Sequence, residues 1–139
     1  GLISGIAIAF ARYSSKTRVI PVEPKGFDST GQSLNMGKAM TLHLAKKSIC
    51  DALQALRPGK VPFACLSSLN MGSPMVVIDK QVCDAMALAY ELRRIILEPA
   101  GAAPLAALLN NPKLAKGKDI VVIASGSNIQ PQDFMRYIE

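Results

Sequence analysis

Residues 75–96 read MVVIDKQVCDAMALAYELRRII, and this stretch decides the fold. Its first four residues are all apolar and predict a short strand, and Asp79 directly after them is a plausible N-cap for a helix. The apolar residues behind it recur with the spacing of one helix face: Val82, Met86, Ala89, Leu92 and Ile96. A strand that passes directly into a long helix is typical of α/β proteins.

The same alternation extends toward the N-terminus. Residues 4–13 are apolar on every side, as expected for a buried helix. Residues 18–23 predict a short strand, although Pro21 within it cannot donate a ladder hydrogen bond. Residues 30–37 predict a short helix that a glycine stops, and residues 61–69 predict another short apolar helix.

The C-terminal third follows the same pattern. Pro99 stands at a first-helical-turn position and opens a helix rich in small residues that runs to residue 109. Residues 119–124 form an apolar run of the kind that is buried on both faces in parallel sheets. Residues 125–128 turn out of this run, and Pro131 opens a last short helix. We therefore expect an α/β fold, with a partial parallel sheet and helices on both of its faces.

Composition excludes several classes of protein. Half of the 139 residues are hydrophobic and 19% are charged, which is typical of a folded domain. No apolar run reaches the roughly 18 residues that a membrane span needs, and the apolar N-terminal stretch lacks the flanks of a signal peptide. Three widely spaced cysteines and a single histidine fit no common zinc pattern. We expect free thiols, a reducing compartment and a cytoplasmic protein that does not bind a membrane.

The net charge of +6 leaves the type of ligand open. Lysine and arginine are scattered along the chain, and only three tyrosines and four phenylalanines are available to stack on bases. These features give little support to a nucleic-acid surface, and we expect no nucleic-acid partner. Positive charge suits an anionic small ligand equally well.

Two places could carry chemistry, because ligands of open α/β sheets gather where strands end and helices begin. At residues 1–5 the free amides of a helix start and two glycines offer an anion site. At residues 125–128 a serine hydroxyl after an apolar run could reach a ring nitrogen or an oxyanion. For each place the alternative interpretation is an ordinary glycine-containing turn.

Six segments together resemble one family in their order and spacing. Their counterparts in that family read GGGGLISG, VEP, QS, TIADGL, VEP[AS]GA and VxLSGGN. In this chain they are residues 1–7 (GLISGIA), 22–24 (VEP), 32–33 (QS), 48–53 (SICDAL), 97–102 (LEPAGA) and 122–128 (VIASGSN). The chain thus resembles the C-terminal part of the serine/threonine dehydratases and serine racemases. These enzymes depend on pyridoxal 5'-phosphate (PLP) and have the tryptophan-synthase-β fold, called fold type II.

The resemblance implies a set of PLP-binding residues. Gly1 and Leu2 would supply the end of a cup of backbone amides around the cofactor phosphate. Ser125 would form a hydrogen bond with the pyridine nitrogen, which a neutral hydroxyl does not hold protonated as a carboxylate would. Glu98 and the backbone at Ala52 would lie near the ring. The chain departs from the family at Ala52 and at the residue two beyond Ser125, where the family has glycine.

The resemblance also implies a divalent cation in some members. Its ligands are the glutamate of VEP, a later backbone carbonyl and an acidic side chain. The corresponding positions here are Glu23, the carbonyl of Phe27, and Ser29 with Asp28 beside it. One carboxylate fewer would weaken the binding of a hard cation. The alternative is that Glu23 is a solvated acid at the end of a strand.

The activity that the resemblance implies is the conversion of L-threonine or L-serine to a 2-oxo acid and ammonia. A serine racemase or a hydroxy-amino-acid dehydratase shares the same motifs, and a non-catalytic α/β binding domain is a third alternative. Residues 1–139 would be part of the PLP-binding large domain without its N-terminal part. The Schiff-base lysine lies before this part in the family, and no lysine here matches its motif. We therefore expect no catalytic residue in this chain, no activity from it alone, and a homo-oligomer for the full-length protein.

Overall fold

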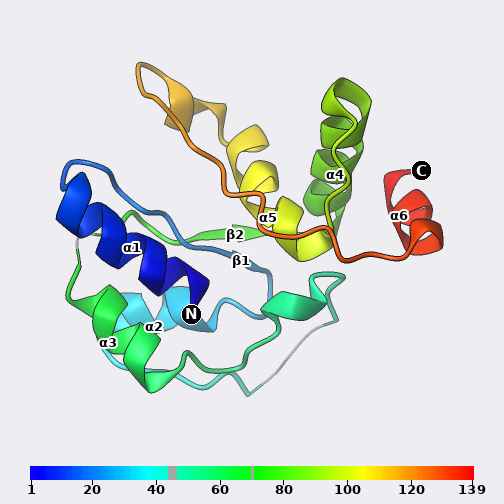
Figure 1. Ribbon diagram of the computed structural model, residues 1–139. Helices are drawn as coiled ribbons and strands as arrows, with labels where there is room; N and C mark the ends of the chain where they lie inside the picture. The colour runs from blue at the N-terminus through cyan, green and yellow to red at the C-terminus, as the bar shows by residue number, and fades with distance from the viewer. Residues whose placement is uncertain (44–46, 70) are drawn as a thin grey trace. The chain divides into compact units, whose positions relative to one another are not determined.

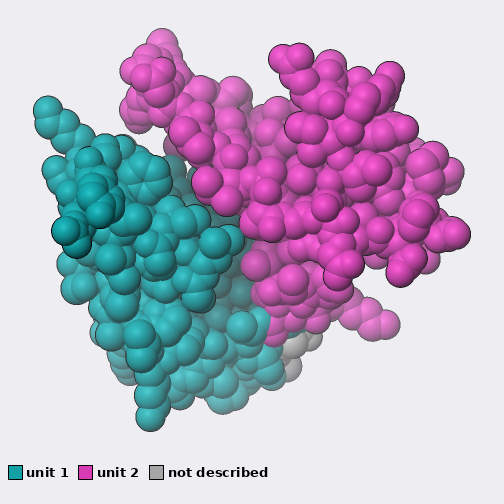
Figure 2. All heavy atoms as spheres, viewed as in Figure 1, with its two compact units in different colours: residues 1–46, 55–76 teal, residues 47–54, 77–139 magenta. Residues whose placement is uncertain are grey.

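The computed structural model describes residues 1–43, 47–69 and 71–139. The chain divides into two compact units, which Figure 2 shows in different colours. Unit 1 comprises residues 1–46 and 55–76, and unit 2 comprises residues 47–54 and 77–139. Segment 47–54 thus belongs to the same unit as a part of the chain that begins more than 20 residues later.

Among its described residues, unit 1 contains three helices and most of a small sheet, whose second strand ends one residue into unit 2 (Figure 1). The elements are α1 (Leu2–Tyr13), β1 (Val22–Pro24), α2 (Ser29–Met36), α3 (Lys60–Ser67) and β2 (Met75–Val77). β1 and β2 pair with each other, and α3 packs against both α1 and α2.

The strands run parallel, as two hydrogen bonds beside them show. The amide of Gly72 donates to the carbonyl of Val19 and that of Met75 donates to the carbonyl of Pro21, both over 2.9 Å. The two partners therefore advance in the same direction along both segments. Pro21 contributes its carbonyl and needs no amide, which is how this predicted strand accommodates a proline. The assigned strand is shorter than predicted and includes Pro24.

Two predictions for unit 1 have different outcomes. The helix at residues 30–37 is confirmed, because α2 ends before Gly37, whose φ of 67° lies in the left-handed region. The prediction that the first helix is buried on every side is wrong. Ser4 and Ala7 are buried, but Ile8 is 49% exposed and Tyr13 is 79% exposed. Within the described residues α1 has α3 on one side, so only one stripe of it is covered.

Unit 2 is built around the packing of two helices. Its elements are η1 (Asp51–Leu53), α4 (Asp79–Arg93), α5 (Pro99–Leu109), η2 (Pro112–Ala115) and α6 (Pro131–Ile138), where η is a 3-10 helix. α4 packs against α5 and α6 (Figure 1). The buried positions of α5 are mostly alanines and a glycine, and small residues let two helices approach closely. From α6, Phe134 packs edge-to-face on Tyr90 of α4, with ring centroids 5.4 Å apart.

The prediction for α4 is correct in part. Val82 and Met86 are fully buried as expected, but Leu92 is 66% exposed and Ile96 lies beyond the helix. The helix ends at Arg93 because the next residue turns left-handed. The prediction that Asp79 is the N-cap is wrong by one position, since Ile78 is the N-cap and Asp79 is the first helical residue.

The predicted strand at residues 119–124 is wrong. The structure assigns no strand there, and Val121 is 78% exposed. A strand requires a neighbour that takes up its backbone hydrogen bonds, and in the described part of the chain β1 and β2 pair only with each other. The prolines at 99 and 131 do open α5 and α6 as predicted. Among the described residues, no helix has the length and apolar character to cross a membrane.

Candidate functional site

Two predicted site residues of unit 2 come together where α5 begins. Glu98 is the N-cap of α5, and its backbone amide donates to the carbonyl of Gly126 over 3.1 Å. Its carboxylate oxygen Oε2 accepts the amide of Asn128, also over 3.1 Å. Glu98 therefore holds the loop that begins with Ser125 at two points, Gly126 and Asn128. We call residues 98–101 and 125–128 the Glu98 junction.

Two glycines make the Glu98 junction sterically tight. A Cβ atom on Gly101 would lie 2.5 Å from the carbonyl oxygen of Gly126 and 2.9 Å from its nitrogen. A Cβ atom on Gly126 would lie 2.8 Å from Cδ of Glu98. Position 101 thus requires glycine, because a methyl group there would meet the backbone of Gly126 and push the two segments apart, whereas a methyl group on Gly126 would displace the Glu98 carboxylate. Neither glycine is a predicted site residue, although each stands inside one of the six motifs.

Ser125 lies at the exposed edge of this junction. The residue belongs to an exposed stretch of unit 2, so a ligand can reach its hydroxyl without displacing core residues. The hydroxyl can donate a hydrogen bond to an unprotonated ring nitrogen, or accept one from a protonated ring nitrogen.

Ala52 belongs to the same unit as Glu98 and Ser125. It is the middle residue of η1, which packs on α5. It is exposed, and its amide donates to Oδ1 of Asp51 over 2.8 Å. The carbonyl and the exposed methyl group of Ala52 are therefore the parts that face a ligand most readily.

Gly1 and Leu2 lie in unit 1, at the start of α1. The carbonyl of Gly1 accepts the amide of Gly5 over 3.1 Å and the hydroxyl of Ser4 over 2.9 Å. No side chain caps this helix start, and the first turn contains no acidic residue. Leu2 is 61% exposed. The positive end of the α1 dipole thus has its amides available for an anion.

Glu23 has a structural role that the sequence analysis missed. Its Oε1 accepts the amide of Thr30 over 2.9 Å, and its Oε2 accepts the amide of Gly31 over 2.7 Å. The carboxylate therefore closes the N-terminus of α2, where Asp28 stands as N-cap without a side-chain cap bond. Burial raises the pKa of the Glu23 carboxyl above its ordinary value, against these hydrogen bonds, which lower it. Glu23 is thus not the solvated acid of the alternative interpretation.

Of the other two predicted cation ligands, the Ser29 hydroxyl is engaged in a hydrogen bond, while the Phe27 residue that carries the predicted carbonyl is held by its amide and its side chain. Ser29 is buried, and its hydroxyl donates to the carbonyl of Ala55 over 2.9 Å. The amide of Phe27 donates to the carbonyl of Pro24 over 2.9 Å, and its side chain is buried. Across the residues that the structure describes, no three His, Cys, Asp or Glu side chains gather in a way that could hold a metal ion. A cation here would share Glu23 with two backbone amides.

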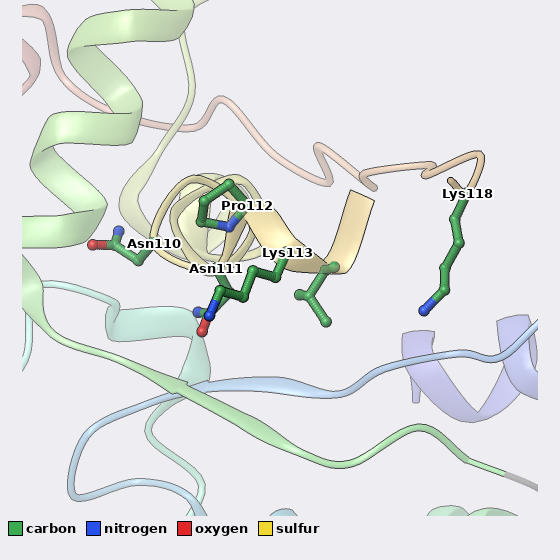
Figure 3. A pocket seen from close by; sticks show the side chains of 6 residues that line it. Asn110, Asn111, Pro112, Lys113 and Lys118 are labelled. Carbon is green, nitrogen blue, oxygen red and sulfur yellow. The ribbon is translucent and has the colours of Figure 1, made fainter. Parts of the chain in front are cut away.

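A surface hollow of about 430 Å³ lies at the end of α5 (Figure 3). The side chains of Asn110 and Asn111 donate to the carbonyls of Ala106 and Ala107, each over 2.9 Å. The carbonyl of Ala106 also accepts the backbone amide of Asn110 over 3.1 Å, so both asparagine side chains bond back to the last turn of α5. The lining residues are Asn110, Asn111, Pro112, Lys113, Leu114 and Lys118, and none of them is a predicted site residue.

Comparisons with known proteins agree with the motifs. Residues 1–126 match the family described as "Pyridoxal-phosphate dependent enzyme". A serine racemase of Arabidopsis thaliana is 34% identical over 134 residues, which are 93% of this chain and 40% of that protein. An L-threonine dehydratase biosynthetic IlvA of Halalkalibacterium halodurans is 33% identical over 128 residues, which are 92% of this chain and 30% of that protein.

Solved structures show the same fold. The structure of maize serine racemase matches with a TM-score of 0.86 and 33% identity, over 97% of this chain and 43% of that chain. The processed threonine deaminase isoform 2 of Solanum lycopersicum matches with a TM-score of 0.88 and 29% identity, over 98% and 38%.

The chain has the α/β architecture of a partial fold type II enzyme, as predicted. It belongs to the family of pyridoxal-phosphate-dependent enzymes. It spans less than half the length of the curated relatives described above.

Proposed function

We propose that this chain is part of a PLP-dependent lyase that converts L-threonine or L-serine to a 2-oxo acid and ammonia. The observation that carries the proposal is the Glu98 junction, which presents Ser125 at an exposed edge beside the glycine-lined start of α5. The relatives named as L-threonine dehydratases and serine racemases support a hydroxy amino acid as the substrate.

The proposed roles follow from the groups that each residue offers. PLP, when bound, supplies an electron-withdrawing ring that favours loss of the α-proton of an amino acid. The open amides at Gly1 and Leu2 would bind its phosphate, as helix N-termini bind anions. The hydroxyl of Ser125 would bond its pyridine nitrogen without holding it protonated. A neutral hydroxyl at this position would suit a lyase, because it would leave the bound ring a weaker electron sink than a carboxylate would.

Glu98 and Ala52 would bound the ring in this proposal. The carboxylate of Glu98 accepts the Asn128 amide through Oε2, which fixes its direction. The Glu98 carboxylate and the backbone of Ala52 would lie near the ring. Glu98 and Ala52 would thus position the ring by shape and by hydrogen bonds, and neither would transfer a proton.

The activity is tested on the complete product of the gene that encodes this chain, called here the complete protein. We expect release of 2-oxo acid and ammonia in equal amounts from L-threonine or L-serine, measured in one assay with chiral analysis of the remaining substrate. Racemised serine without oxo acid would replace the lyase with a serine racemase, which the 34% identity to such an enzyme favours as second candidate. A hydroxy-amino-acid dehydratase would show oxo acid from a different hydroxy amino acid. The absence of bound PLP and of both activities would leave a non-catalytic α/β binding domain.

A divalent cation at Glu23, the Phe27 carbonyl and Ser29 is a secondary proposal. The half-buried carboxylate supports it, because a buried carboxyl gains from a nearby positive charge. The cation would have to share Glu23 with the amides of Thr30 and Gly31. Binding of Mn²⁺, followed by electron paramagnetic resonance, should be lost in Glu23→Gln and kept in Asp84→Asn, an exposed acid of α4. Equal binding to both variants would rule out this site.

We further propose a cytoplasmic homo-oligomer. The three free cysteines support a reducing compartment. Light scattering of the complete protein during gel filtration gives its mass, and a monomer would contradict the proposal.

A further inference from the structure

A single carboxylate of α4 binds two residues of segment 47–54. The hydroxyl of Ser48 donates to Oδ1 of Asp79 over 2.8 Å, and the amide of Ile49 donates to Oδ2 over 3.3 Å. These bonds join positions about 30 residues apart in the sequence. A charged acceptor makes hydrogen bonds about twice as strong as a neutral one does.

Ser48 also forms hydrogen bonds with the residues at both ends of η1. Its hydroxyl oxygen accepts the amide of Cys50 over 3.2 Å, and its carbonyl accepts the side-chain amide of Gln54 over 2.8 Å. Within the turn, the amide of Leu53 donates to the carbonyl of Cys50 over 3.0 Å. The residues that flank η1 are therefore bonded through Ser48 to the first residue of α4, Cys50 by its backbone amide and Gln54 by its side chain.

Packing fixes the same segment from the other side. Cys50 is completely buried, and η1 packs on α5, the helix that Glu98 begins. Burial raises the pKa of the Cys50 thiol to about 11, so this cysteine is a core residue and not a reactive thiol. With Cys50 in the core and Ser48 on Asp79, Ala52 has little freedom to move relative to α5.

We propose that Asp79 is a positioning residue for the cofactor. It sets the position of the Ala52 backbone against α5 through Ser48, and it touches neither cofactor nor substrate. This inference rests on the proposed function, because it gives Ala52 a place beside the PLP ring. The removal of Asp79 takes away both bonds between the segment and α4, and the removal of the Ser48 hydroxyl takes away the shorter one; the turn then keeps its buried cysteine.

The test measures PLP binding to the complete protein by absorbance titration, with visible circular dichroism as the report of ring orientation. We expect Asp79→Ala and Ser48→Ala each to raise the Kd for PLP about tenfold and to change the dichroism band. Because the two residues share one bond, the double variant should resemble either single variant and not show the product of their effects. Ser48→Thr keeps a hydroxyl and should restore wild-type binding.

The matched control is Asp84→Ala. This variant removes the same charge from the same helix, but Asp84 is exposed and pairs with Lys80 over 2.9 Å. We expect it to leave the Kd and the dichroism band unchanged.

Three outcomes separate the explanations. If the wild-type protein binds no PLP, the proposed function fails and this inference fails with it. If the wild type binds PLP and the Asp79 and Ser48 variants lose thermal stability but keep the wild-type Kd and dichroism, Asp79 is only structural and the inference alone is overturned. Should Asp79→Ala not fold, the comparison of Ser48→Ala with Ser48→Thr decides between the same two results.

Discussion

Replacing Gly101 by alanine tests the Glu98 junction most sharply. The new Cβ atom would lie 2.5 Å from the carbonyl oxygen of Gly126, whereas ordinary contact begins at 3.4 Å. The two segments must therefore separate by about 0.9 Å, and both atoms in conflict belong to backbone, which cannot rotate away as a side chain can. The displacement moves the loop that carries Ser125.

The expected loss of stability follows from comparable overpacked sites in other proteins. Inserting a methyl group into a well-packed position typically lowers the free energy of unfolding by about 1–3 kcal/mol. Displacement of Ser125 should also weaken PLP binding about tenfold, which corresponds to the loss of one hydrogen bond. Urea denaturation and absorbance titration of the complete protein measure the two effects.

Gly5→Ala is the matched control, because nothing lies within 4 Å of a Cβ atom at this position of α1. Alanine should raise helix stability there by up to about 1 kcal/mol, since glycine is unfavourable within a helix. If Gly101→Ala proves as stable as Gly5→Ala and binds PLP like the wild type, the close approach of Gly101 to Gly126 is refuted.

Three further predictions concern other parts of the chain. The pKa of Glu23 is raised from 4.5 in the folded state, so its contribution to stability is fully present below about pH 4.5 and is lost as the pH rises through the folded pKa. Urea denaturation should show the stability of the wild type relative to Glu23→Gln falling as the pH rises above about 4.5, and a rise would contradict the burial of this carboxyl. Cys50, with a pKa of about 11, should resist iodoacetamide at neutral pH until the protein unfolds, and peptide mass mapping of a folded sample labelled there would disprove its burial. The 139-residue chain alone should gain no PLP mass on a lysine after borohydride reduction, and a labelled lysine would show that the chain carries the attachment residue.

Much of the secondary structure follows from local signals in the sequence. Gly37 ends α2 in the left-handed region, and the prolines at 99 and 131 open α5 and α6. Each signal acts through the backbone geometry of a single residue, which needs no partner elsewhere in the chain. Such positions can therefore be predicted from sequence alone.

Burial could not be predicted in the same way. The apolar residues of α1 and of residues 119–124 were expected to be covered on all sides, yet Tyr13 and Val121 are among the most exposed. An apolar run shows that burial would be favourable, but the neighbouring segment has to be present to provide it.

The site residues also divide into those that a local motif predicts and those whose contacts depend on the folded structure. Glu98 and Ser125 were identified through motifs, and the structure brings their segments together through Gly126. The bonds of Glu23 to α2 and of Asp79 to Ser48 were missed, because hydrogen bonds between distant positions leave no periodic pattern in the sequence. Asp79 was noticed only as a helix-start residue, which explains its position in α4 but not its second role.

The most direct test of the central claim is a crystal structure of the complete protein with PLP. The account predicts that the Ser125 hydroxyl lies within hydrogen-bond distance of the pyridine nitrogen, about 2.7–3.2 Å, with the Glu98 carboxylate still bonded to the Asn128 amide. A ring bound elsewhere, or a pyridine nitrogen that faces a carboxylate in place of Ser125, would contradict it.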